Sequence, residues 1–195
     1  MPAARSGGLL SVTTLSDELG PAAATVKRYL ALLEEVFLIK RIPAWSRNVS
    51  SRATTAPKLA FVDSGIAAHR VGADLRSLLR PTGQFGPLLE GSVLMELARQ
   101  LTWSEDEAEL FHYRTRDQVE VGAVLENRRG EVVGVEVKAA STVHPNDFRG
   151  LRHLAARLGD DFRVGIVLHT GRQTLPFGPG MLAMPISALW ETRAA

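Results

Sequence analysis

The feature that most constrains the fold is the run VEVGAVLENRRGEVVGVEVKAAS at residues 119–141, in which two apolar segments flank a charged turn. Arg129-Gly130 lies in the turn, so the pattern predicts two strands that are neighbours in a sheet. LFHYRTR, just before this run, predicts another strand, and FRVGIVLHTG and MLAMPISALW predict two apolar strands near the end of the chain. The strand-rich region therefore extends over most of the C-terminal half.

Helical patterns flank the three consecutive strands. LLEGSVLMELARQLTWS precedes them, with Glu90 expected in its first turn, and HPNDFRGLRHLAARLG follows them. The apolar faces expected for these two helices are Leu89, Val93, Leu97 and Leu101 in the first and Leu151, Leu154 and Leu158 in the second. The order helix, three strands, helix, strand predicts an α/β domain with a mixed central sheet, which we assign to residues 88–190.

The first third of the chain predicts a different unit. SVTTLSDELG starts with hydroxyl residues that can cap a helix, and Gly20-Pro21 ends it. The next run, AAATVKRYLALLEEVFLI, predicts a second helix, whose apolar stripe is Val26, Tyr29, Leu30, Leu33 and Phe37. Two β-rich runs, 37–42 and 58–62, follow around a polar loop. Together they predict an N-terminal winged helix-turn-helix over residues 8–63, joined to the α/β domain by a connector at 64–87.

Charge is unevenly distributed along the chain. Residues 1–70 hold nine Lys/Arg against five Asp/Glu, and the remainder holds fourteen against sixteen. A nucleic-acid footprint is therefore expected in the first third, with Thr25 near a base edge and four cations on phosphates: Lys27, Arg28, Arg47 and Arg52. The alternative is that the same scaffold joins domains while these cations are merely solvated.

Composition narrows the class of protein. The chain has no cysteine, which excludes disulfides and thiolate metal sites and fits an intracellular setting. No apolar run approaches the roughly 18–20 residues of a membrane span, and the start MPAARSGGLLS lacks the apolar core of a signal peptide. We therefore expect a cytoplasmic protein with no membrane partner.

Glu136 and Lys138 form an E-x-K pair at the end of an apolar strand. Alternate residues of a strand point to one face, so the two side chains are expected to lie together. Metal-dependent phosphodiester cleavage needs carboxylates that converge on Mg²⁺ and a lysine that stabilises developing charge. An adjacent strand would supply a second carboxylate, and Glu90 on the preceding helix would supply a third. The alternative is a solvated ion pair on an amphipathic strand.

Several runs in order resemble a known family. They are TTLSDELGPAAATVKRYLALLEEVFLIKRIPAWSRN, PKLAFVDSGIAA, GPLLEGSVLMEL, HYRTRDQVEVGAVLE and GVEVKAAS followed by NDFRGLRHL. Over about residues 8–170 the chain is similar to the C-terminal region of prokaryotic AAA+-type ATPases, the domain of unknown function 4143. The resemblance implies an upstream P-loop ATPase domain, a winged helix, and a restriction-endonuclease-like domain similar to PD-(D/E)XK nucleases.

The resemblance also assigns site residues. Glu90 matches the helix glutamate, and Glu136 and Lys138 match the E-x-K pair. Arg114 matches the arginine of a tyrosine-arginine signature and is a further candidate for nucleic-acid binding. The family's next motif usually reads Glu-Val-Asp, and its aspartate is expected to be the central metal ligand.

Here that motif reads Glu120-Val121-Gly122, so the aspartate is replaced by glycine. Glycine has no side chain that can bind a metal. The resemblance therefore implies an impaired Mg²⁺ site, with Glu120 as the candidate replacement.

Three functions remain open from the sequence. The favoured one is a nucleic-acid- or partner-binding module of an AAA+-type ATPase, with the ATPase domain upstream or in trans. ATP would bind only through that domain, because this chain lacks a G-x-x-x-x-G-K-[ST] motif. The second is an Mg²⁺-dependent DNA nuclease that uses Glu90, Glu120, Glu136 and Lys138. The third is a winged-helix transcription regulator whose second domain dimerises, which would make the protein a homo-oligomer.

Overall fold

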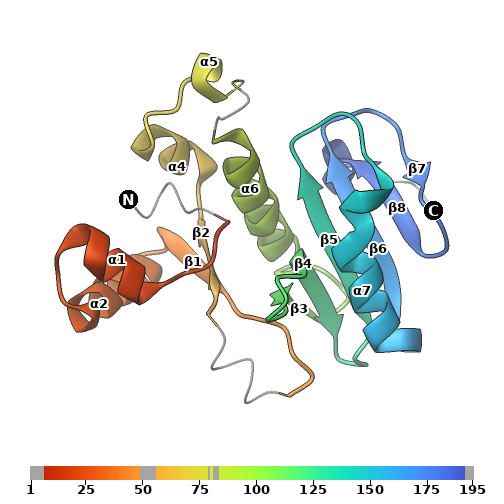
Figure 1. Ribbon diagram of the computed structural model, residues 1–195, viewed down its shortest axis with the longest axis horizontal. Helices are drawn as coiled ribbons and strands as arrows, with labels where there is room; N and C mark the ends of the chain where they lie inside the picture. The colour runs from red at the N-terminus through yellow and green to blue at the C-terminus, as the bar shows by residue number, and fades with distance from the viewer. Residues whose placement is uncertain (1–6, 49–55, 79, 81–83, 192–195) are drawn as a thin grey trace. The chain divides into compact units, whose positions relative to one another are not determined.

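The computed structural model describes residues 7–48, 56–78, 80 and 84–191 (Figure 1). The chain divides into two compact units, Met1–Met95 and Glu96–Ala195. The domain boundaries that the sequence predicts, 8–63, 64–87 and 88–190, stay a prediction.

The first unit begins with two helices, α1 (Val12–Leu19) and α2 (Ala23–Glu35). The Ser11 hydroxyl accepts a hydrogen bond from the Thr14 N–H at 3.2 Å and caps α1. Gly20 ends α1 in the left-handed region, at φ +88°, which glycine adopts without a steric penalty. Both ends of α1 therefore follow directly from local sequence, as predicted.

The predicted helical stripe reaches Phe37, where the predicted β-rich run 37–42 also begins, and the extension of the helix to Phe37 is wrong. The helix ends at Glu35, after which the Phe37 N–H donates to the Glu34 carbonyl at 3.0 Å and the Leu38 N–H donates to the Leu33 carbonyl at 2.9 Å. Phe37 has φ +58°. This pair of bonds around a left-handed residue is a Schellman motif, which closes the helix and turns the chain into the next strand.

Strands β1 (Ile39–Ile42) and β2 (Lys58–Phe61) pair antiparallel, with Ile39 opposite Phe61. They pack on the two helices around a core of six buried side chains: Leu10, Leu15, Val26, Leu30, Ile39 and Leu59. Of the predicted stripe, Val26 and Leu30 belong to this core and Leu33 is partly buried against it. Tyr29 and Phe37 are 52% and 81% exposed.

Three helices follow: α4 (Ser64–Arg70), α5 (Leu75–Leu78) and α6 (Phe85–Gln100). Helix α6 begins before the predicted start at residue 88, so Glu90 lies in its second turn and the prediction of the first turn is wrong. The helix continues through Met95 into the second unit.

The second unit contains a six-stranded mixed sheet, in the order β3-β4-β5-β6-β8-β7 (Figure 1). Its strands are β3 (Ala108–Arg114), β4 (Glu120–Asn127), β5 (Val132–Lys138), β6 (Phe162–His169), β7 (Leu175–Pro176) and β8 (Met181–Pro185). The β3-β4-β5 pairs are antiparallel, and β5-β6 and β6-β8 are parallel. The predicted mixed sheet is confirmed.

Helix α7 (Arg149–Leu158) makes the crossover between the parallel strands β5 and β6, after the 3-10 turn η2 (Pro145–Phe148). The three leucines predicted for its apolar face, Leu151, Leu154 and Leu158, are all buried. Gly134 and Gly165 are paired in the sheet, and a Cβ on either would lie within 3.1 Å of Leu151 side-chain atoms. These two glycines allow α7 to pack closely on the sheet.

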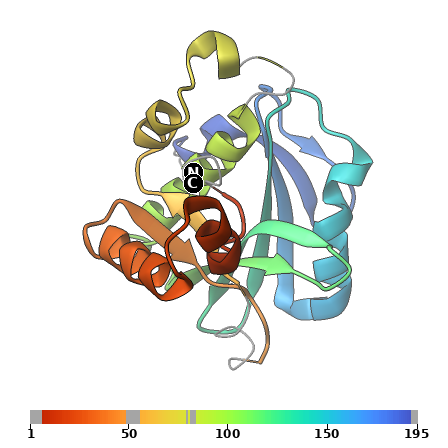
Figure 2. The same cartoon turned by 60° about the vertical axis from the view of Figure 1, so that its left-hand side comes forward.

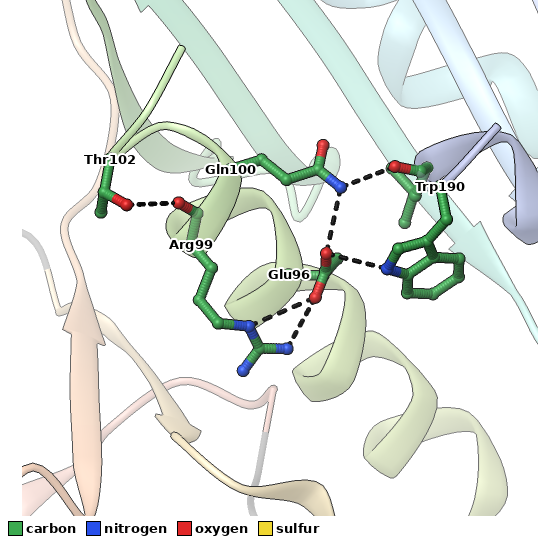
Figure 3. A network of polar contacts seen from close by, with 6 residues as sticks. Glu96, Arg99, Gln100, Thr102 and Trp190 are labelled. Carbon is green, nitrogen blue, oxygen red and sulfur yellow. Dashed lines mark hydrogen bonds and ion pairs between the residues drawn. The ribbon is translucent and has the colours of Figure 1, made fainter. Parts of the chain in front are cut away.

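The last described element is a 3-10 turn, η4 (Ile186–Leu189), which is hydrogen-bonded to the last turns of α6 (Figure 3). The Trp190 indole N–H donates to Glu96 at 2.9 Å, and the Gln100 amide donates to the Leu189 carbonyl at 2.6 Å. Hydrogen bonds from Arg99 and then Gln100 hold the pKa of Glu96 below its ordinary value. Glu96 is therefore charged at neutral pH and anchors the C-terminal turn.

Candidate functional site

Strand β4 contains a bulge at the position where the sequence lacks its expected aspartate. Phe111 pairs with Val124 and Tyr113 pairs with Val121, so β4 spans the same stretch as β3 with one extra residue. Gly122 lies within that stretch. A bulge disrupts the ladder locally and leaves backbone groups that need another hydrogen-bond partner.

Glu136 supplies that partner. Its Oε2 accepts a hydrogen bond from the Gly122 N–H at 3.0 Å. Gly122 is buried and Glu136 is half-buried, so this carboxylate satisfies a backbone donor that lies away from water. The E-x-K glutamate is thus bonded to the residue that replaces the aspartate.

Lys138 lies on the same face of β5 as Glu136. A Cβ on Gly134 would point at Leu151 of α7, and the two-residue alternation of a strand places residues 134, 136 and 138 on one face. The Lys138 ammonium lies 3.4 Å from the Asp147 carboxylate in η2, which also accepts the His144 N–H at 2.8 Å. Asp147, which the sequence prediction missed, is therefore the ion-pair partner of the site lysine.

Arg114 and Glu120 form a second ion pair at the edge of the sheet. They are register partners on β3 and β4, and the Arg114 guanidinium lies 3.0 Å from the Glu120 carboxylate. Arg114 also donates to the Gln118 side chain at 3.3 Å. Both predicted site residues are therefore engaged with each other.

Glu90 belongs to the first unit, where its carboxylate forms an ion pair with the Lys58 ammonium. Lys58 is only 2% exposed, although it is the first residue of β2. Its pairing links β2 to α6. Sequence spacing gives no signal for this pair, because the two residues lie far apart in the chain.

The cations predicted for nucleic acid are only partly described. Lys27 and Arg28 are exposed on α2, and as consecutive helical residues they point about 100° apart. Arg47 is exposed after β1, whereas Arg52 lies outside the described residues.

Among the residues that the structure describes, no group of three or more His, Asp or Glu side chains is arranged to hold a metal ion. In the same part of the chain, no helix is both long enough and apolar enough to cross a membrane.

Comparison with known families identifies the chain. The family model described as "Domain of unknown function (DUF4143)" matches residues 85–189, more than half of the sequence. The chain belongs to the DUF4143 family. The match includes all the site residues predicted from the resemblance: Glu90, Arg114, Glu120, Glu136 and Lys138. A second family model, "Domain of unknown function (DUF8612)", matches residues 1–77.

Similar curated proteins occur in mycobacteria. The DUF4143 chain is 29% identical over 186 residues to the uncharacterized protein Mb2031c of Mycobacterium bovis and, equally, to the uncharacterized protein Rv2008c of Mycobacterium tuberculosis. The aligned region is 95% of this chain but 40% of each relative. No solved structure matches the sequence.

Proposed function

We propose that this DUF4143 chain is a non-catalytic binding module of a cytoplasmic AAA+-type ATPase. Its first unit is a winged helix-turn-helix, for which the order of two helices and an antiparallel strand pair is the support. Its second unit is a PD-(D/E)XK nuclease-like domain, supported by the order α6, β3, β4, β5, α7, β6 and by the mixed sheet.

The hydrogen bond from the Gly122 N–H to Glu136 carries the non-catalytic assignment. An Mg²⁺ site needs several carboxylate oxygens that are free to turn toward the ion. If Glu136 turned away, a buried N–H would lose its acceptor, which costs about 1–3 kcal/mol. Gly122 offers no carboxylate in exchange.

Glu90 carries a similar penalty. Its carboxylate is paired with the buried Lys58 ammonium, so a metal ion would have to compete with that ion pair. Metal binding would have to outweigh both costs. The arrangement therefore favours a domain that keeps the scaffold and does not cleave.

The proposed connection to an ATPase rests on the resemblance to the C-terminal region of AAA+-type ATPases and on the greater length of the mycobacterial relatives. Since the chain spans 40% of the mycobacterial relatives, each relative has additional polypeptide that could contain an ATPase domain. In our proposal ATP binds only to such a domain, in the same polypeptide or in trans.

A cleavage assay tests the non-catalytic assignment. We expect no nicking of plasmid DNA above background with Mg²⁺ or Mn²⁺. Cleavage that disappears in Glu136→Ala and persists in Glu105→Ala, which removes an exposed acid, would show instead a working metal nuclease that uses Glu90, Glu120, Glu136 and Lys138.

Restoring the missing acid is the sharper test. We expect Gly122→Asp to gain Mn²⁺ binding, measured by calorimetry, because it returns a carboxylate beside Glu136. Gly122→Asn is the matched neutral control and should gain none. If Gly122→Asp folds and still binds no metal, the carboxylates are not arranged as in a nuclease, and the nuclease-like assignment fails.

A DNA-binding function, as in a transcription regulator, is favoured by the exposed Lys27 and Arg28 on α2. It predicts duplex binding at low salt that weakens as salt rises and when these two cations are removed. Absence of binding at low salt would leave a protein partner as the ligand of the module.

A further inference from the structure

Helix α2 has a second apolar face that is exposed among the residues that the structure describes. Tyr29, Leu32 and Val36 are 52%, 50% and 60% exposed, and their spacing of three and four residues places them on one side of the helix. Phe37 and Leu38, 81% and 37% exposed, follow directly after the helix end. We call these five residues the α2 face.

The clustering is strong. Ten large apolar side chains are exposed in the described part of the chain, and half of them belong to the α2 face. Single exposed apolar residues are ordinary, whereas a contiguous group marks an interaction surface.

Phe37 adds an independent observation. It occupies the left-handed position of the Schellman motif, where glycine is usual and a side chain has a steric cost. Its ring is mostly exposed, so burial within the chain does not offset that cost. Backbone strain of this kind clusters at functional sites, and aromatic side chains are common at interfaces, so an exposed ring at such a position supports an interaction surface.

Two charged residues beside the α2 face indicate what kind of partner would fit it. Arg28 and Glu35 lie two helical turns apart on the same side of α2, next to Leu32, and both are exposed. Within the part of the chain that the structure describes, neither has an ion-pair partner. The face thus carries a positive charge toward one end and a negative charge toward the other.

This arrangement is self-complementary. If a second copy packs its α2 antiparallel to the first about a two-fold axis near Leu32, Arg28 of each copy faces Glu35 of the other, and the apolar residues meet between them. A nucleic acid would fit this surface less well, because phosphates are bound by cations and Glu35 would repel them.

We infer that the α2 face is the interface of a homodimer in which the α2 helices of two copies pack antiparallel. This inference does not depend on the ATPase or nuclease assignment.

Sedimentation equilibrium tests it. The wild-type chain has a mass of 21.2 kDa, and we expect the average mass to rise toward twice that value between about 1 µM and 1 mM, the range of weak and moderate affinities. Arg28→Glu and Glu35→Arg should each weaken dimerisation about tenfold or more, because each places like charges opposite one another twice. The double variant should recover dimerisation, since it reverses both charges of every pair.

Lys27→Glu is the matched control, because it makes the same charge change on another side of α2 and should leave dimerisation unchanged. A wild-type protein that stays monomeric throughout would overturn the inference. So would single swaps without effect, or a double variant that fails to recover. If Arg28→Glu abolished duplex DNA binding in a protein that never dimerised, nucleic acid would be the occupant instead.

Discussion

Helices α2 and α7 have similar apolar patterns but differ in how much of their apolar surface is buried. In α7 every leucine is buried, and no large apolar side chain is exposed: the large exposed side chains are polar, such as Arg152 and His153. In α2 the core takes Val26 and Leu30 and leaves Tyr29 and Leu32 exposed. The apolar side of α7 is buried within its own unit, whereas part of the apolar surface of α2 is left exposed by the described residues of its unit. The apolar pattern of an amphipathic helix therefore indicates how much surface is suited to burial, and not which chain buries it.

The charged residues of the two regions differ in the same way, because a group in the second unit is ion-paired and, among the described residues, two beside the α2 face are not. In the second unit Glu131 is bonded by Arg163 and Asn127, and Arg129 lies 3.1 Å from the same carboxylate. On α2, Arg28 and Glu35 have no such neighbours among the described residues.

The largest expected effect separates the two helices directly. Leu154→Ala in α7 should lower the free energy of unfolding by about 2–5 kcal/mol, because it leaves a cavity at a fully buried site. Leu32→Ala in α2 should cost less than about 0.5 kcal/mol in the dilute monomer, because that leucine is half exposed. Urea denaturation of both variants measures the difference. Equal losses of unfolding free energy in the two variants would mean that the α2 face is packed within the chain, so that α2 and α7 do not differ in burial.

The sequence predicts the fold best where the apolar periodicity of a segment is enough to define its secondary structure and its buried face. Helix α7 and the three strands before it were correctly predicted, because their apolar periodicity matches the faces that the sheet buries. The end of α2 was not, because Phe37 occupies a position that glycine usually marks. The predicted stripe includes Tyr29, which is 52% exposed, because periodicity cannot distinguish an apolar face that is buried from one that is left exposed.

The candidate site was less predictable for a related reason. Its residues could be named from motifs, yet their partners depend on the fold. The Glu136 bond to the Gly122 N–H depends on a bulge in β4, and Glu90 pairs with Lys58 from a distant strand. Neither the bulge nor the pairing leaves a pattern in local sequence.

A smaller effect concerns the strained residue on α2. Phe37→Gly should stabilise the monomer by up to about 1 kcal/mol, because glycine adopts φ +58° without the Cβ penalty, less the extra freedom that it gives the unfolded chain. The same substitution should weaken dimerisation by removing the ring. Phe37→Ala is the control, because it loses the ring and keeps the strain, so only dimerisation should suffer. Denaturant midpoints and sedimentation give the two readouts; a less stable Phe37→Gly monomer would show that the ring packs within the chain.

The smallest effect tests the local charges of the second unit. The hydrogen bond from Arg163, followed by that from Asn127, lowers the pKa of Glu131 from its ordinary value of 4.5 to about 2. A carboxyl group whose pKa is lower in the folded state stabilises the protein above its unfolded pKa, and this contribution disappears as the pH falls through the folded value. Glu131→Gln should therefore unfold at a slightly lower temperature than wild type at pH 7, and the gap should close between about pH 4.5 and pH 2. Glu105→Gln, at an exposed acid, controls for the general loss of a negative charge. If the difference in unfolding temperature stayed constant across this range, Glu131 would contribute by packing and not by its charge. The contrast between the second unit and α2 would then lie only in their apolar contacts.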